Sequence, residues 1–272
     1  MRKILQYLRI ILTVGLPIIF SPIYLGKYSR HPEKYPLEVR YAKARKLISK
    51  VVRAFRTDIV IINKHYWDEL DGQRYLWVSN HLSMYEILAY IYVSEKPIIF
   101  AAKEETLKMP FVGRIFRMLN GIALDRKNVM NQLAEIKQIV NQIKDESMPI
   151  MGVFPEGTRN KEPEKHCLEF KGGSMKLAYM AKVPILPVST YGSFRALSKK
   201  HYLKSYPLFI QFDKPITPEE YKDIPTVTLA TKLQHQIDEN VDCLRALDKE
   251  KVYAQKLSNK RKEKETWMDT IS

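Results

Sequence analysis

The most constraining feature of this chain is an alternation, from residue 58 onward, of short runs rich in β-branched and aromatic residues with longer runs of helical periodicity. Such alternation is typical of an α/β fold, in which helices cover the faces of a sheet. The expected strands cover residues 58–62, 75–79, 97–101, 122–125, 149–154, 185–189 and 207–212. The expected helices cover residues 84–93, 111–119, 128–146, 172–181 and 226–247. We therefore expect a mixed β-sheet flanked by helices.

Positive charge is concentrated at the N-terminus. The formal net charge of the 272 residues is +15, and residues 1–56 hold thirteen Lys or Arg against two acids. A nucleic-acid-binding protein more often spreads its basic residues over the folded domain, with aromatic residues among them. A basic segment beside an apolar run instead favours contact with an anionic membrane surface, so we expect a lipid partner and no nucleic acid.

The apolar run covers residues 10–25 and carries no charge. A spanning helix needs about 20 apolar residues, and Pro17 and Pro22 would kink this one. We expect the run to dip into the membrane or lie along it. The alternatives are a tilted single span, a buried core helix and a cleaved signal peptide. The signal peptide is disfavoured because residues 20–22 offer no small-residue cleavage pattern.

A second N-terminal segment, residues 37–55, has apolar residues spaced by three and four, with Lys and Arg on its other faces. This pattern predicts a basic amphipathic helix. The helix could pack on its own domain with a solvated outer face, or it could form the second arm of a membrane-surface hairpin, which the neighbouring apolar run favours. We expect a membrane-associated hairpin over residues 1–56, the main domain over 57–247, and a charged tail over 248–272 that is a frayed helix or disordered.

The first candidate for chemistry is a histidine at a strand end, followed five residues later by a carboxylate (SNHLSMYE, residues 79–86). Residues five apart on an ideal helix lie about 140° apart, so His81 can meet Glu86 only from a loop before the helix. Ser83 and Glu86 fit a capping box that would start a helix there. Glu86 could therefore hold the His81 ring, or it could do no more than cap the helix, with His81 an ordinary loop histidine.

Three further blocks follow strands or form them. Residues 154–159 (FPEGTR) and 121–126 (GIALDR) each end in an arginine, and residues 183–188 (VPILPV) form a short apolar strand bracketed by prolines. Backbone N–H groups of a glycine-containing turn, together with an arginine, can hold an anion. Each block alone could be structural, because a surface arginine is more often an ion-pair partner than a phosphate ligand.

In this order, the four blocks closely resemble the signature of the glycerolipid acyltransferase family, typified by 1-acylglycerol-3-phosphate acyltransferase, with FPEGTR as the most specific element. The resemblance is detailed over residues 75–190. It implies the glycerolipid acyltransferase fold, with the catalytic domain at residues 57–247 behind an N-terminal membrane hairpin. It also implies transfer of a fatty acyl group from acyl-CoA or acyl carrier protein to the sn-2 hydroxyl of 1-acylglycerol-3-phosphate, giving phosphatidic acid. Another lysophospholipid or glycerol-3-phosphate is the alternative acceptor.

The resemblance also implies roles for individual residues. His81 is expected to be the general base and Glu86 its carboxylate partner. The family usually has aspartate at the second position, so the carboxylate of this chain is displaced by about 1.5 Å. The residues expected to bind substrate are Arg126, Glu156, Gly157, Thr158 and Arg159. Lys103, just after an expected strand, and Lys171 are secondary candidates for contact with an anion.

The residue types fit this chemistry on their own terms. An alcohol attacks well only if a base takes its proton, and histidine suits that task near neutrality. A hydrogen-bonded carboxylate fixes which ring nitrogen faces the alcohol. No metal or other cofactor is expected, because His81 and Glu86 lack the HExxH spacing and the two cysteines form no CxxC pair. A thiol nucleophile at Cys167 is the weakest alternative.

A second function class competes with the enzyme. It is a non-catalytic peripheral membrane protein that binds anionic lipid through residues 1–56. In either case we expect the protein at the cytoplasmic face of the cell membrane, held peripherally, monotopically or by a single span.

Overall fold

The computed structural model describes residue 12 and residues 15–109, 111–124, 129–144, 150–196 and 204–269. Its centre is a seven-stranded sheet of order β1-β7-β6-β2-β5-β3-β4. β6 and β7 are antiparallel and every other neighbouring pair is parallel, so the prediction of a mixed sheet flanked by helices is confirmed. The strands are β1 (Thr57–Ile62), β2 (Tyr75–Ser79), β3 (Ile98–Lys103), β4 (Ile122–Leu124), β5 (Ile150–Val153), β6 (Ile185–Tyr191) and β7 (Tyr206–Phe212).

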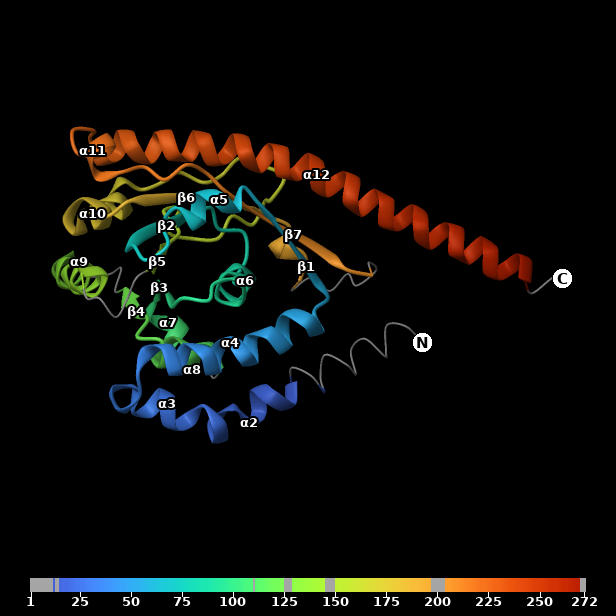
Figure 1. Cartoon of the computed structure of the whole chain (residues 1–272), viewed down its shortest axis with the longest axis horizontal. Helices are drawn as coiled ribbons and strands as arrows, with labels where there is room; N and C mark the ends of the chain where they lie inside the picture. The colour runs from blue at the N-terminus through green and yellow to red at the C-terminus, as the bar shows by residue number, and fades with distance from the viewer. Residues whose placement is uncertain are drawn as a thin grey trace.

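Helices cover both faces of this sheet (Figure 1). On one face lie α9 (Val129–Lys144), α10 (Gly172–Ala181) and α12 (Thr226–Asp269); on the other lie α4 (Leu37–Ala54), α6 (Tyr85–Val93) and α8 (Val112–Met118). The remaining elements are short: α2 (Leu16–Tyr24), α3 (Gly26–Arg30), η2 (Pro32–Lys34), α5 (Lys64–Asp68), α7 (Glu104–Leu107), η3 (Ser193–Arg195) and α11 (Pro218–Tyr221).

The central strand β2 shows why both faces need cover. All five of its residues are buried. Leu76 and Val78 enter the core under α10 and α12, whereas Tyr75 and Trp77 enter the core under α4 and α6. Successive side chains of a strand point to opposite faces, so a run that is apolar throughout can be buried only between two layers of helices.

The predicted amphipathic helix of residues 37–55 is α4, and its apolar stripe faces the protein. Tyr41, Ala44 and Ile48 are buried in the core that α4 shares with α6. Arg40 is also buried, and it donates hydrogen bonds to the Tyr35 carbonyl oxygen at 2.9 Å and to Asn120 Oδ1 at 2.9 Å. The apolar stripe of α4 therefore packs on the domain itself. This is the alternative that the sequence favours less than a membrane-surface hairpin.

The predicted apolar run of residues 10–25 is described only in part, mainly as α2. Its Ile19 and Ile23 side chains are 67% and 76% exposed. Arg114 of α8 donates a hydrogen bond to Ser21 Oγ at 2.6 Å and so ties α2 to the domain. Among the described residues, no helix combines the length and the apolar character needed to cross a bilayer. The membrane hairpin stays a prediction.

The helix predicted for residues 226–247 continues as α12 to Asp269. Figure 1 shows its last turns projecting beyond the sheet. Asp248 is 1% exposed and forms a two-point ion pair with Arg195, and Gln255 bonds to Ser205. Polar contacts hold this part of the helix. Apolar periodicity alone therefore predicts that the helix ends too early.

Candidate active site

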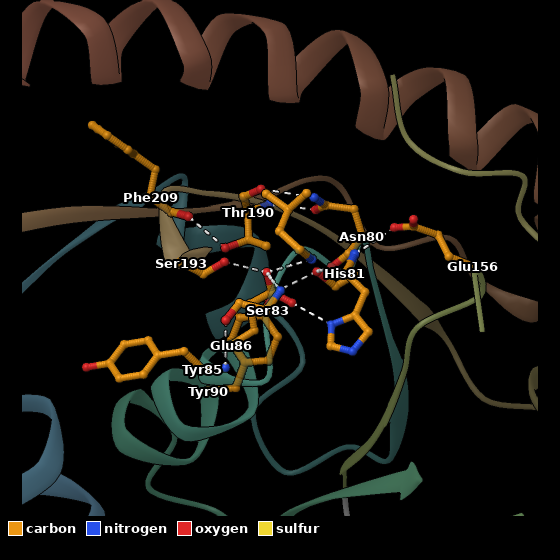
Figure 2. A network of polar contacts seen from close by, with 12 residues as sticks. Asn80, His81, Ser83, Tyr85, Glu86, Tyr90, Glu156, Thr190, Ser193 and Phe209 are labelled. Atoms are coloured by element: carbon orange, nitrogen blue, oxygen red, sulfur yellow. Dashed lines mark hydrogen bonds and ion pairs between the residues drawn. The ribbon is translucent and has the colours of Figure 1, made fainter. Parts of the chain in front are cut away.

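The candidate base, His81, lies in the loop between β2 and α6, at the carboxyl end of a central strand. The residue before it, Asn80, is fully buried and pairs with the backbone of Thr190 on β6. Its side-chain amide donates to the Thr190 carbonyl oxygen at 3.0 Å, and its Oδ1 accepts from the Thr190 N–H at 2.8 Å. These two bonds fix the point at which the chain leaves the sheet, and with it the start of the His81 loop (Figure 2).

His81 and Glu86 form a close pair. His81 Nδ1 lies 2.7 Å from Glu86 Oε2, and the exposed fractions of the two side chains are 12% and 0%. An ionised carboxylate can only accept hydrogen bonds, so the Nδ1 atom carries the proton that is shared with Glu86. The tautomer that follows leaves Nε2, on the other side of the ring, as a hydrogen-bond acceptor. A ring held in this way can take a proton from a substrate at Nε2.

The second oxygen of Glu86 accepts three more hydrogen bonds. They come from the N–H groups of Leu82 at 2.9 Å and Ser83 at 3.1 Å, and from the Ser193 hydroxyl at 2.6 Å. Ser83 Oγ in turn accepts from the Tyr85 N–H at 3.2 Å. Glu86 therefore braces the start of α6 and holds the His81 ring at the same time, so the two interpretations of the SNHLSMYE block do not exclude each other.

The FPEGTR block and the residue after it, Asn160, hold the backbone of His81 on both sides. Glu156 Oε1 accepts from the His81 N–H at 2.6 Å, and the Asn160 N–H donates to the His81 carbonyl oxygen at 2.7 Å. The Phe154 ring stacks on the imidazole, with centroids 4.0 Å apart and planes inclined by 18°. Two segments about 75 residues apart in sequence thus meet around His81.

Glu156 is buried where these two segments meet. Its other oxygen accepts from the Leu168 N–H at 3.2 Å. Burial raises the pKa of Glu156 to about 8. The two hydrogen bonds from backbone N–H groups act in the opposite direction and lower the pKa, whereas the nearby Glu86 charge raises it further by a smaller amount. A carboxyl group with both oxygens engaged by the backbone holds the loop in shape. Its predicted contact with substrate stays a prediction.

Of the other predicted binding residues, the structure describes Gly157, Thr158 and Arg159, which follow one another in a single turn. Gly157 has φ +68° and its N–H closes the turn onto the Phe154 carbonyl oxygen at 2.9 Å, so a residue free of strain at positive φ is needed there. Thr158 and Arg159, next in the turn, are exposed. Arg126 and the side chain of Lys103 lie outside the described part of the structure. Their role in binding stays a prediction.

A thiol nucleophile gains no support. Cys167 is buried, and burial raises the pKa of its thiol, which keeps it protonated and unreactive. His166 bonds to Asp238 Oδ2 at 2.6 Å and its side chain is 79% exposed. Within the described residues, no three His, Cys, Asp or Glu side chains gather closely enough to hold a metal ion.

Sequence reasoning missed Ser193 and the anchoring roles of Asn80 and Phe154. Ser193 follows Gly192 at the end of β6, and Gly192 has φ +96°. A glycine just beyond an apolar strand is the only local signal for this turn. Nothing in the spacing of the chain relates it to Glu86, because the two residues are 107 positions apart.

Comparisons with known proteins show the family of the chain. The model of the family described as Acyltransferase matches residues 46–191, more than half of the chain. The chain belongs to the acyltransferase family. This acyltransferase is 29% identical over 253 residues, 87% of its length and 92% of the relative's, to a protein of Mycoplasma pneumoniae named probable 1-acyl-sn-glycerol-3-phosphate acyltransferase. A relative from Haemophilus influenzae, named 1-acyl-sn-glycerol-3-phosphate acyltransferase, is 30% identical over 44% of the chain and 49% of its own length.

The solved structures include a similar fold. The crystal structure of the 1-acyl-sn-glycerophosphate acyltransferase PlsC from Thermotoga maritima aligns with a TM-score of 0.66 and 24% identity, over 90% of this chain and 98% of that one. This likeness supports the fold of the acyltransferase described here. The His81–Glu86 pair and the turn from Phe154 to Asn160 lie inside the matched residues of the family model, whereas Ser193 lies just beyond them.

Proposed function

We propose that this acyltransferase moves a fatty acyl group from a thioester to the sn-2 hydroxyl of 1-acylglycerol-3-phosphate, giving phosphatidic acid. The observation that carries the proposal is the 2.7 Å contact between His81 Nδ1 and Glu86 Oε2, which leaves His81 Nε2 as the proton acceptor. The names of the curated relatives support the choice of acceptor.

In the proposed reaction the substrate hydroxyl donates its proton to His81 Nε2 as its oxygen attacks the thioester carbonyl carbon. The Glu86 carboxylate stabilises the imidazolium that forms. The carbonyl bond then re-forms, the carbon–sulfur bond breaks, and the imidazolium returns the proton to the departing thiolate. The acyl chain ends as an ester, the donor leaves as a free thiol, and His81 is neutral again. No protein nucleophile takes part.

The substrate charges would be held around the FPEGTR turn. The proposed ligand of the acceptor or donor phosphate is Arg159, which is exposed, with Thr158 and the turn N–H groups as further donors. Arg126 and Lys103 are proposed to complete this anion site. Either acyl-CoA or acyl carrier protein would deliver the thioester. Anchoring the phosphate aims the hydroxyl at His81, which is a positioning effect.

The proposed place of action is the cytoplasmic face of the cell membrane. Exposed apolar side chains gather on α2: Leu16, Ile19, Phe20, Ile23 and Tyr24. Lys27 and Arg30 follow directly on α3 and are exposed. An apolar helix face beside cations suits insertion into the headgroup region of an anionic bilayer. α2 would hold the protein on the surface where its lipid acceptor resides.

A donor-by-acceptor assay on the purified protein in liposomes tests the proposal. With lysophosphatidate as the acceptor, the thioester donor, acyl-CoA or acylated acyl carrier protein, should release one free thiol for each phosphatidic acid formed. Glycerol-3-phosphate and lysophosphatidylcholine serve as the competing acceptors and should turn over more slowly. Binding to the liposomes without thiol release for any pair would contradict the proposal and favour the non-catalytic lipid-binding protein.

A further inference from the structure

Ser193 is the one partner of Glu86 that comes from a distant part of the described chain. Its hydroxyl lies 2.6 Å from Glu86 Oε1, and both side chains are fully buried. Because an ionised carboxylate has no proton to give, the hydroxyl must be the donor. The other hydrogen bonds of Glu86 come from residues 81–83, in the loop directly before its helix α6.

The hydrogen bonds of Glu86 are divided unevenly between its two carboxylate oxygens, and this division lets the Ser193 bond set the orientation of the carboxylate. Three donors converge on Oε1 and one, the His81 ring, on Oε2. A glutamate side chain has one more rotatable bond than an aspartate, so its carboxylate needs an additional contact to stay in one orientation. With Oε1 turned toward Ser193, Oε2 is left facing His81, as Figure 2 shows.

The turn that presents Ser193 is itself firmly held. Gly192 has φ +96°, and a Cβ at this position would lie 2.3 Å from the Pro207 carbonyl oxygen. Two residues after Ser193, Arg195 forms its two-point ion pair with the buried Asp248 of α12 and lies over the Phe194 ring, 4.7 Å from its centroid. The hydroxyl is thus fixed relative to the sheet and to α12.

We propose that Ser193 is a positioning residue of the acyl-transfer reaction, which orients the Glu86 carboxylate so that His81 keeps Nε2 free for the substrate hydroxyl. This inference rests on the proposed role of His81 as the base. It gives a physical account of how the longer side chain of a glutamate can be held in one orientation beside His81. The Ser193 bond fixes the longer side chain.

Ser193→Ala tests the proposal, with Ser189→Ala as the matched control. Ser189 is a fully buried serine four residues earlier on β6, and its hydroxyl has no hydrogen-bond partner among the described residues. Ser193→Ala should lower kcat by about tenfold to a hundredfold, because a misplaced base loses reactive geometry, and should leave both KM values nearly unchanged. Ser189→Ala should change neither, and Ser193→Thr, which restores a hydroxyl, should recover most of the lost kcat.

Two further measurements keep the test decisive if a variant folds poorly. In a His81→Ala background, Ser193→Ala should not lower the residual turnover further, since there is no ring left to orient. The low-field proton resonance of the His81 ring, identified by its absence in His81→Ala, should shift in Ser193→Ala and not in Ser189→Ala. This resonance does not depend on turnover, so it separates a failure of the positioning role from a failure of the proposed function.

Three results would overturn the positioning role. The first is an unchanged kcat and an unchanged His81 resonance in Ser193→Ala. The second is a loss of turnover that is equally large with and without His81. The third is a loss that Ser189→Ala reproduces.

Discussion

At the scale of single residues, the site depends on one carboxylate that serves two purposes. The five-residue separation from His81 predicts a loop that folds back, and the His81–Glu86 contact is present. The predicted capping box is only half formed: Glu86 accepts from the Ser83 N–H, but Ser83 Oγ accepts from the Tyr85 N–H, and α6 begins one residue later than expected, after Met84. What the spacing could not predict are the contacts from other segments. Glu156 reaches the His81 N–H and Ser193 reaches Glu86 only because β2, β5 and β6 lie side by side in the sheet.

Glu86→Gln should lower kcat far more than Glu86→Asp. The amide oxygen of glutamine would accept the bonds from Leu82, Ser83 and Ser193, which places its NH₂ group against His81 Nδ1. The ring would then carry its proton on Nε2 and could not act as a base, a loss on the order of a thousandfold to ten-thousandfold. Steady-state thiol release measures both variants. A greater loss in Glu86→Asp would show that Glu86 only caps α6.

Glu156 should make stability depend on pH. Burial raises the pKa of Glu156 from its ordinary value to about 8. The folded protein therefore favours the protonated form of Glu156. The stability that this preference contributes is complete below the pKa of Glu156 in the unfolded chain, and it is lost as the pH rises through the pKa of Glu156 in the folded protein. The free energy of unfolding is measured with urea at several pH values between these two pKa values. It should fall more steeply with rising pH in the wild type than in Glu156→Gln. Equal slopes would mean that Glu156 stays ionised in the folded state.

At the scale of elements, the strands and helices around the site follow from their apolar patterns. The predictions for β2 and α10 match their observed bounds, because β2 is buried throughout and α10 buries one apolar face at helical spacing. The prediction for α12 stopped at residue 247, whereas the helix reaches Asp269. The cause is Asp248, a buried charge whose partner, Arg195, lies on η3. An ion pair of this kind leaves no periodic signal in the sequence.

Arg195→Met should destabilise the protein strongly. The substitution leaves the Asp248 carboxylate without its cation, and the side chain of Asp248 is only 2% exposed. Loss of one partner of a buried ion pair costs about 3–5 kcal/mol of unfolding free energy. Lys96→Met is the matched control, because the Lys96–Asp71 pair is 45% and 80% exposed and water already solvates it. Urea unfolding of both variants gives the comparison. A similar small loss in the two would argue that the Arg195 pair adds nothing to the fold.

At the scale of the whole molecule, the N-terminal residues divide between the domain and the proposed membrane contact. α4 completes the core on one face of the sheet, so removal of residues 1–56 would unfold the domain as well as remove any lipid-binding surface. α2 instead leaves its apolar side chains exposed and is attached through Ser21 and Arg114. Only α2, within the described N-terminal segment, combines an exposed apolar face with attachment to the domain.

Replacement of both Ile19 and Ile23 by Glu should weaken binding to anionic vesicles by at least about tenfold, since each isoleucine would lose a favourable transfer out of water. Stability should not change, because both side chains are exposed. Val227→Glu is the control: Val227 is 67% exposed in the first turn of α12, on the opposite side of the sheet from α2 (Figure 1). Vesicle co-sedimentation that is unchanged in the double variant would place the membrane contact elsewhere.

The proposed reaction depends on His81 as the base, and a second histidine of the chain, His166, provides the control. His166 makes the same kind of Nδ1 contact with a carboxylate, Asp238, but its side chain is 79% exposed, whereas that of His81 is 12% exposed. The most direct measurement is thiol release from acyl-CoA with lysophosphatidate by His81→Ala and His166→Ala. We predict a loss of about a hundredfold to ten-thousandfold for His81→Ala and wild-type turnover for His166→Ala. Near-wild-type turnover by His81→Ala would contradict the account.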